Sequence, residues 1–212
     1  MRGILVSSSA IIVERHGATA WIMINRPEVG NLINPSVIDG LDDALGAAED
    51  DDDISVVVIG GVGDDFCKGA DVGALGRIDA YSTRMKFGLR MQRTGSVFGR
   101  IDDFPKPVIG AINGSAIAGG LEIVLCCDLV VATRTAAFGE GHATYGQLPG
   151  GGGSIRLARL VGPTRAKYML FTSRSMPAQT FLEWGVVHQI VDAADLVTSV
   201  DRLAESVALA RP

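Results

Sequence analysis

The residues best suited to chemistry gather around an Ala-Gly-Gly segment that opens an apolar helix carrying one carboxylate, Glu122. Backbone N–H groups at the start of a helix have no intrahelical acceptor, so Gly119 can offer its N–H to an anion. The earlier loop FCKGAD follows a buried strand and offers the N–H of Ala70 in the same way. Two N–H groups converging from separate loops stabilise the oxyanion of an enolate or a thioester. Each glycine-rich loop taken alone is more typical of a tight structural turn.

A histidine follows the same helix further along the chain. His142 has an imidazole that exchanges protons near neutral pH, so it can act as an acid or a base beside Glu122. The other two histidines, His16 in a turn and His188 on a late strand, are interpreted as structural. The neighbours of Glu122 are apolar, which predicts a carboxylate that faces a pocket and has a raised pKa.

Strands and helices that would position these residues alternate along the chain. A hairpin is predicted from runs at 11–13 and 19–24, and a helix capped by Asn34 begins at Pro35 and runs toward Glu49. Further strands are predicted at 55–59, 108–112, 129–132 and 186–191, and further helices at 74–101, 119–127, 152–161, 163–171 and 196–209. This alternation predicts an α/β fold with mainly parallel strands.

Length and composition are typical of a single globular domain and argue against two other classes of protein. The chain has 212 residues, of which 47% are apolar and 20% charged, so we expect one domain over residues 1–212. A net charge of −5 argues against nucleic-acid binding. The longest apolar region is interrupted by Glu122 and Asp128, which argues against a membrane span. The three cysteines cannot all pair, which indicates a reducing compartment, and we expect a cytoplasmic protein.

Four ordered motifs carry a resemblance to a known family. They are Asn25-Arg26-Pro27-Glu28, FCKGAD, KPVIGAINGSAIAGGLEIVLCCDLVVA, and AAFGE followed by YGQLPGGGGSIRLARLVG. In order and spacing they resemble the crotonase superfamily of enoyl-CoA hydratases and isomerases, over nearly the whole chain. The resemblance implies a spiral of ββα units, assembly as a homotrimer or hexamer, and an acyl-CoA thioester as substrate.

The resemblance also implies roles for individual residues. The oxyanion hole would be formed by the N–H groups of Ala70 and Gly119, and Glu122 and His142 would be the catalytic side chains. The residues expected to bind substrate and coenzyme A are Arg26, Lys68, Gly69, Asp71 and Gly120. Lys68 stands where the family usually has a small residue, and it contacts a phosphate or is simply solvated. No metal is expected, and coenzyme A is part of the substrate rather than a separate cofactor.

Two departures from the family pattern keep the reaction open. Family hydratases use two glutamates; Glu122 matches the first, but His142 stands at the second, and Glu140 lies two residues earlier where the family is commonly neutral. His142 either transfers protons or is only a hydrogen-bonded pocket residue. The chain ends at Pro212, where family members usually continue, so we expect a shortened or absent C-terminal helical segment.

Three functions therefore remain as expectations. The first is hydration of an enoyl-CoA. The second is double-bond isomerisation or C–C hydrolysis by a single glutamate with a histidine. The third is a non-catalytic acyl-CoA-binding partner subunit.

Overall fold

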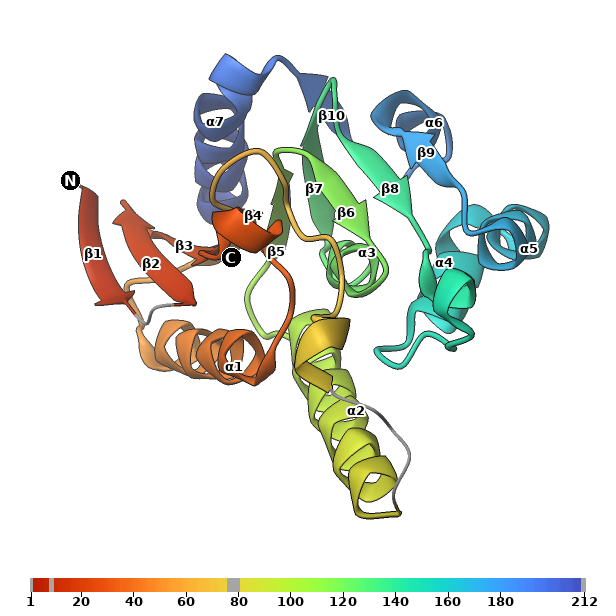
Figure 1. The fold of residues 1–212 in the computed structure, drawn as a ribbon. Helices are drawn as coiled ribbons and strands as arrows, with labels where there is room; N and C mark the ends of the chain where they lie inside the picture. The colour runs from red at the N-terminus through yellow and green to blue at the C-terminus, as the bar shows by residue number, and fades with distance from the viewer. Residues whose placement is uncertain (1, 8–9, 76–80, 211–212) are drawn as a thin grey trace.

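A seven-stranded sheet forms the centre of the protein (Figure 1). The computed structural model describes residues 2–7, 10–75 and 81–210. The strand order is β1-β2-β3-β4-β5-β7-β10. The strands span Arg2–Ser7, Ile11–His16, Thr19–Ile24, Val56–Gly61, Val108–Ile112, Leu129–Thr133 and Gln189–Val191, in that order. Within this sheet the first three strands pair antiparallel and the other neighbouring strands pair parallel, which confirms the predicted hairpin and the mainly parallel α/β fold.

Central strands β4 and β5 are buried on both faces, and for this reason they are apolar at successive positions. Val57 and Ile59 of β4 pack into the larger core with helix α1 (Pro35–Asp50), whereas Val56 and Val58 face helix α7 (Leu196–Leu209). Asn34 caps α1 as predicted, because its Oδ1 accepts a hydrogen bond from the Val37 N–H at 3.0 Å.

A second, three-stranded sheet was not predicted from the sequence. It pairs β6 (Ser115–Ile117) in parallel with β8 (Ala137–Gly139), and β8 in antiparallel with β9 (Ser175–Pro177). Helix α3 (Gly119–Val124) begins just after β6, and the 3₁₀ turn η3 (His142–Tyr145) begins just after β8. Because parallel strands end at the same edge of a sheet, β6 and β8 deliver α3 and η3 to one place.

Further helices lie beside the two sheets (Figure 1). They are α2 (Tyr81–Asp102), α4 (Gly153–Val161), α5 (Pro163–Thr172) and α6 (Ala178–Glu183). Three further 3₁₀ turns span Pro27–Val29, Val72–Leu75 and Ala193–Asp195. Among the described residues, no helix combines the length and apolar character needed to cross a bilayer.

Three predicted element boundaries were wrong. The helix predicted from residue 74 begins at Tyr81, after a 3₁₀ turn at Val72–Leu75, and residues 76–80 lie outside the described ones. The helix predicted to reach residue 127 ends at Val124. The strand predicted over 186–191 is reduced to Gln189–Val191, because the N–H groups of Val186 and Val187 instead donate to the carbonyl of Phe181 at the end of α6.

Candidate active site

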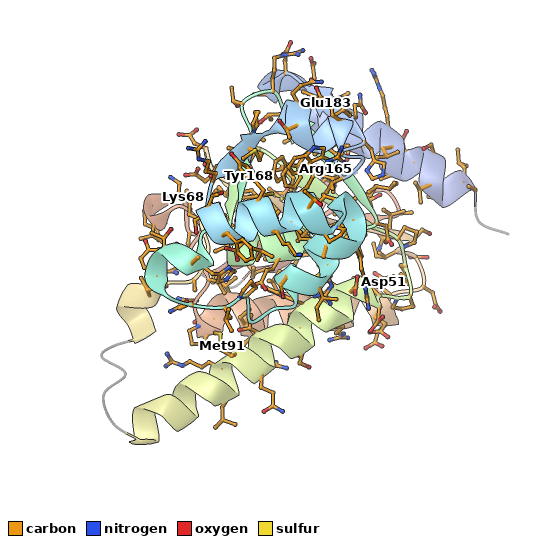
Figure 2. All side chains as sticks on the ribbon, turned by 90° about the vertical axis from the view of Figure 1, so that its right-hand side faces the viewer. Asp51, Lys68, Met91, Arg165, Tyr168 and Glu183 are labelled. Atoms are coloured by element: carbon orange, nitrogen blue, oxygen red, sulfur yellow. The ribbon has the colours of Figure 1, made fainter. Side chains whose placement is uncertain are left out.

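A cavity of about 760 Å³ opens where α1, α2 and α3 meet the segment 142–151. Ala70, Gly119, Glu122 and His142, the four residues predicted to do chemistry, all line it. Met91 of α2 and Gly150 both line the cavity. They lie close together, since a Cβ built on Gly150 would be 3.0 Å from the Sδ of Met91. In both views the N-terminal half of α2 extends away from the rest of the fold, and Figure 2 shows Met91 further along this helix.

The two loops with candidate anion-binding N–H groups lie against each other. A Cβ built on Gly119 would lie 3.9 Å from the Cα of Gly69, and one built on Gly69 would lie 3.0 Å from the Cβ of Ala118. Gly69 has a φ of +99°, a conformation that L side chains rarely adopt. A residue other than glycine would therefore both strain this backbone and push the loops apart.

Both candidate N–H groups are available for a ligand. Ile33 pairs with the Gly69 carbonyl and the Asp71 N–H, so the N–H of Ala70 between them points the other way. Gly119 is the first residue of α3, and its N–H has no acceptor within the helix. Within the part of the chain that the structure describes, neither N–H donates a hydrogen bond. The two groups have the availability that an oxyanion hole requires.

Glu122 is held by the start of the next helix. Its Oε1 accepts hydrogen bonds from the N–H of Gly151 at 2.8 Å and of Gly153 at 2.9 Å, and Gly153 is the first residue of α4. The residue is only 4% exposed. Burial raises the pKa of Glu122, and the two N–H groups and the charge of His142 counteract only part of that rise. The second oxygen, Oε2, is left to face His142.

His142 lies between two carboxylates. Its Nε2 is 3.7 Å from Oε2 of Glu122, and its Nδ1 is 2.6 Å from Oε1 of Glu140. Burial lowers the pKa of His142, but the hydrogen bond to Glu140 and the charges of both carboxylates outweigh it, so the pKa is raised overall. The geometry favours an imidazolium that can give up a proton at Nε2.

Only some of the residues expected to bind coenzyme A line the cavity. Asp71 lines the cavity and accepts from the Arg26 guanidinium at 3.3 Å, and Arg26 also donates to the Leu32 carbonyl at 2.6 Å. Lys68 has a half-exposed side chain at the edge of the fold and pairs with Asp65 at 2.7 Å (Figure 2). Gly69 and Gly120 are packing positions of the two loops. Their role toward coenzyme A stays a prediction.

No role for Glu140 is predicted from the sequence, although its charge is unusual for its position in the motif. Its side chain is buried and contacts His142 twice, through Nδ1 and through the backbone N–H at 3.2 Å from Oε2. The available signal was the Glu-Gly-His triplet, because Gly141 has a φ of +67° and lets the two side chains meet.

The Cys67 thiol is not among the groups that line the cavity. Burial raises the pKa of the Cys67 thiol to about 12, so it is not a nucleophile near neutral pH. Among the described residues, no group of three or more His, Cys, Asp or Glu side chains is arranged to hold a metal ion.

Comparison with known proteins shows extensive similarity. The family model of enoyl-CoA hydratase/isomerase matches residues 14–212. The chain is 34% identical over 198 residues to the short-chain-enoyl-CoA hydratase of Clostridium acetobutylicum, covering 93% of this chain and 74% of the relative. It is 37% identical over 195 residues to the crotonyl-CoA hydratase of Syntrophomonas wolfei, covering 92% of this chain and 74% of that one.

Solved structures show the same fold. An enoyl-CoA hydratase from Bacillus anthracis superposes with a TM-score of 0.86 at 30% identity, covering 94% of this chain and 76% of the other. Pseudomonas aeruginosa DspI superposes with a TM-score of 0.90 at 34% identity, covering 98% of this chain and 78% of the other. The expected ββα architecture is therefore confirmed.

Proposed function

The chain belongs to the enoyl-CoA hydratase/isomerase family, and we propose that it adds water to the double bond of a short-chain 2-enoyl-CoA thioester. The observation that carries the proposal is the placement of Glu122 and His142, 3.7 Å apart, in one cavity with the free N–H groups of Ala70 and Gly119. The two hydratase relatives support a short acyl chain.

The N–H groups of Ala70 and Gly119 bind the thioester carbonyl oxygen in this proposal. As water adds to Cβ, the double-bond electrons move toward this oxygen and an enolate forms. Preorganised N–H groups stabilise that charge more strongly in the transition state than in the substrate. The reaction is accelerated for this reason.

Glu122 and His142 handle the protons. Oε2 of Glu122 and Nε2 of His142 are 3.7 Å apart, which is less than the combined length of two hydrogen bonds of about 2.8 Å each. One water can therefore contact both side chains. The water oxygen bonds to Cβ, Glu122 takes the water proton, and Nε2–H of His142 gives a proton to Cα. The proton on Glu122 then passes to Nε2, which restores both side chains, and one water is consumed per turnover. The raised pKa of Glu122 makes its carboxylate a stronger base. The raised pKa of His142 keeps the protonated imidazolium populated, so that it can serve as the acid.

Coenzyme A enters with the substrate, and the proposal assigns the protein no separate cofactor. We further propose that residues 1–212 act as one acyl-CoA-binding domain within a homotrimer or hexamer. The cytoplasm is the proposed location, which suits three free thiols.

The test incubates the purified chain with crotonyl-CoA and identifies the product by mass. Gain of one water supports the proposal, and His142→Ala should lower the rate by about a hundredfold or more. A surface variant, Asp192→Asn, removes an exposed ion pair with Arg134 and serves as the matched control.

The other outcomes separate the competing functions. Movement of the double bond of a 3-enoyl-CoA without hydration would identify an isomerase. Cleavage of a diketone substrate would identify a C–C hydrolase. Binding of acyl-CoA without turnover would identify a non-catalytic partner, and any of these three results would overturn the hydratase proposal.

A further inference from the structure

We infer that Glu140 is a positioning residue: it binds the Nδ1–H of His142 and thereby makes Nε2, which faces Glu122, the nitrogen that gains and loses the catalytic proton. The inference rests on the proposed function, because it assigns a second carboxylate to the same site. His142 would then act as one half of a carboxylate–imidazole pair rather than as an isolated acid or base.

The contact between Glu140 and His142 is short and doubly anchored. Oε1 of Glu140 lies 2.6 Å from Nδ1 of His142, and Oε2 accepts the backbone N–H of His142 at 3.2 Å. The same N–H also lies 2.9 Å from the Glu140 carbonyl oxygen. The carboxylate therefore holds both the ring and the backbone that carries it.

This contact selects the imidazole tautomer. A carboxylate only accepts hydrogen bonds, and a neutral imidazole has one N–H. Hydrogen bonding to Glu140 places that N–H on Nδ1, which leaves the lone pair of neutral His142 on Nε2. Without Glu140 the ring could carry its proton on either nitrogen, and it could also rotate away from the cavity.

The burial of Glu140 argues for a specific role. Its side chain is 5% exposed, and burying a charge is costly unless a partner compensates it. The compensating partner is His142, whose ring is 12% exposed. Protonated His142 thus lies between two carboxylates, Glu140 on its own loop and Glu122 on α3, while Asp71 lines the cavity paired with Arg26.

The inference predicts two separate effects of removing the charge. Glu140→Gln keeps an oxygen that can accept the Nδ1–H but has no negative charge, so the His142 imidazolium is less stabilised. The pKa of His142 should then fall, and the alkaline limb of the kcat/KM profile should move to lower pH. Glu140→Ala removes the acceptor as well, and its kcat should fall by about tenfold to a hundredfold with a smaller change in KM.

The decisive readout does not depend on activity. Protein labelled with ¹⁵N-histidine has three histidines, and a spectrum of His142→Ala assigns the His142 signals. We expect wild-type His142, once neutral, to carry its proton on Nδ1, and we expect its titration midpoint to fall in Glu140→Gln. Asp192→Asn should leave both unchanged. A purely structural role for Glu140 would lower stability without moving this midpoint.

The outcomes distinguish the two proposals. If wild-type His142 carries its neutral proton on Nε2, the inference is overturned without any variant having to fold. An unmoved midpoint in folded Glu140→Gln also overturns it. If the tautomer and the midpoint behave as expected but crotonyl-CoA is not hydrated, the proposed function fails while the Glu140–His142 pairing stands.

Discussion

The proposed mechanism gives Glu122 a chemical role in addition to its structural one, and two substitutions separate the two roles. Glu122→Gln keeps a carbonyl oxygen where Oε1 accepts the N–H groups of Gly151 and Gly153, but it cannot take a proton. We expect its unfolding free energy to stay within about 1 kcal/mol of the wild type, since both hydrogen bonds remain possible. The hydration rate should fall by about 10²- to 10⁴-fold, which is the usual contribution of acid–base catalysis.

Glu122→Ala removes the acceptor as well as the base. Two buried N–H groups then lose their partner, at about 1–3 kcal/mol each, so the unfolding free energy should drop by about 2–6 kcal/mol. Water entering the adjoining cavity would bring the loss toward the lower value. The difference in unfolding free energy between Glu122→Ala and Glu122→Gln measures the contribution of the two hydrogen bonds. The hydration rate of Glu122→Gln measures the contribution of Glu122 to proton transfer.

The pH dependence of stability provides a check on Glu122→Gln. Burial raises the pKa of Glu122 above its usual 4.5 in the folded state, so the unfolded chain releases this proton at lower pH than the folded protein does. The wild type therefore loses stability relative to Glu122→Gln as pH rises from 4.5 through the folded pKa. Urea unfolding at a series of pH values measures this difference, and hydration of crotonyl-CoA measures the rate. If Glu122→Gln retains the wild-type rate, or if Glu122→Ala is as stable as Glu122→Gln, Glu122 does not have these two roles.

Three further changes test other contacts. Gly120→Ala places a Cβ against the carbonyl oxygen of Cys67, so we expect urea unfolding to show a loss of about 3 kcal/mol or more; a wild-type midpoint would contradict this packing. Although burial lowers the pKa of His142, its carboxylate neighbours raise it above 6.5 on balance, so protonated His142 stabilises the fold below pH 6.5 and this contribution disappears as pH rises through the folded pKa. The difference in unfolding free energy between the wild type and His142→Gln, measured by urea unfolding, should therefore shrink in alkaline solution. A difference that grows with pH would mean that the folded protein lowers the pKa of His142 instead of raising it. Lys106→Met removes an ammonium group bonded to three carbonyls at the C-terminal end of α1, and thermal unfolding should show a loss of about 1–2 kcal/mol.

Local sequence signals were sufficient for the elements with strong patterns. Asn34 followed by Pro35 marked the start of α1, and the apolar spacing marked α7 over Leu196–Leu209. The run of apolar residues after residue 55 indicated a strand buried on both faces, and β4 at Val56–Gly61 has that environment. These signals act over a few residues and do not depend on the rest of the fold.

The part of the fold that builds the site was the hardest to predict. Strands β6, β8 and β9 have three residues each, too few for a periodic pattern, and their pairing joins distant segments. Their register determines that α3 and η3 start side by side, which brings Glu122 to His142. The motif resemblance indicated these two residues, but the contact between them depends on tertiary structure.

The role inferred for Glu140 was hidden for a different reason. A carboxylate is usually solvated, so the sequence around Glu140 gives no reason to expect a buried side chain. The left-handed turn at Gly141 and the burial of both side chains create the contact with His142. Neither feature is visible in a pattern of apolar residues.

In the proposed mechanism one cavity binds an acyl thioester with its carbonyl oxygen at Ala70 and Gly119 and its double-bond carbons at Glu122 and His142. The most direct measurement is a crystal structure with an unreactive acyl-CoA bound. We expect the thioester oxygen at about 2.7–3.1 Å from both N–H nitrogens, with Cα beside Nε2 of His142 and a water on Glu122 facing Cβ. A thioester oxygen that contacts neither N–H group, or an acyl chain that lies outside this cavity, would contradict it.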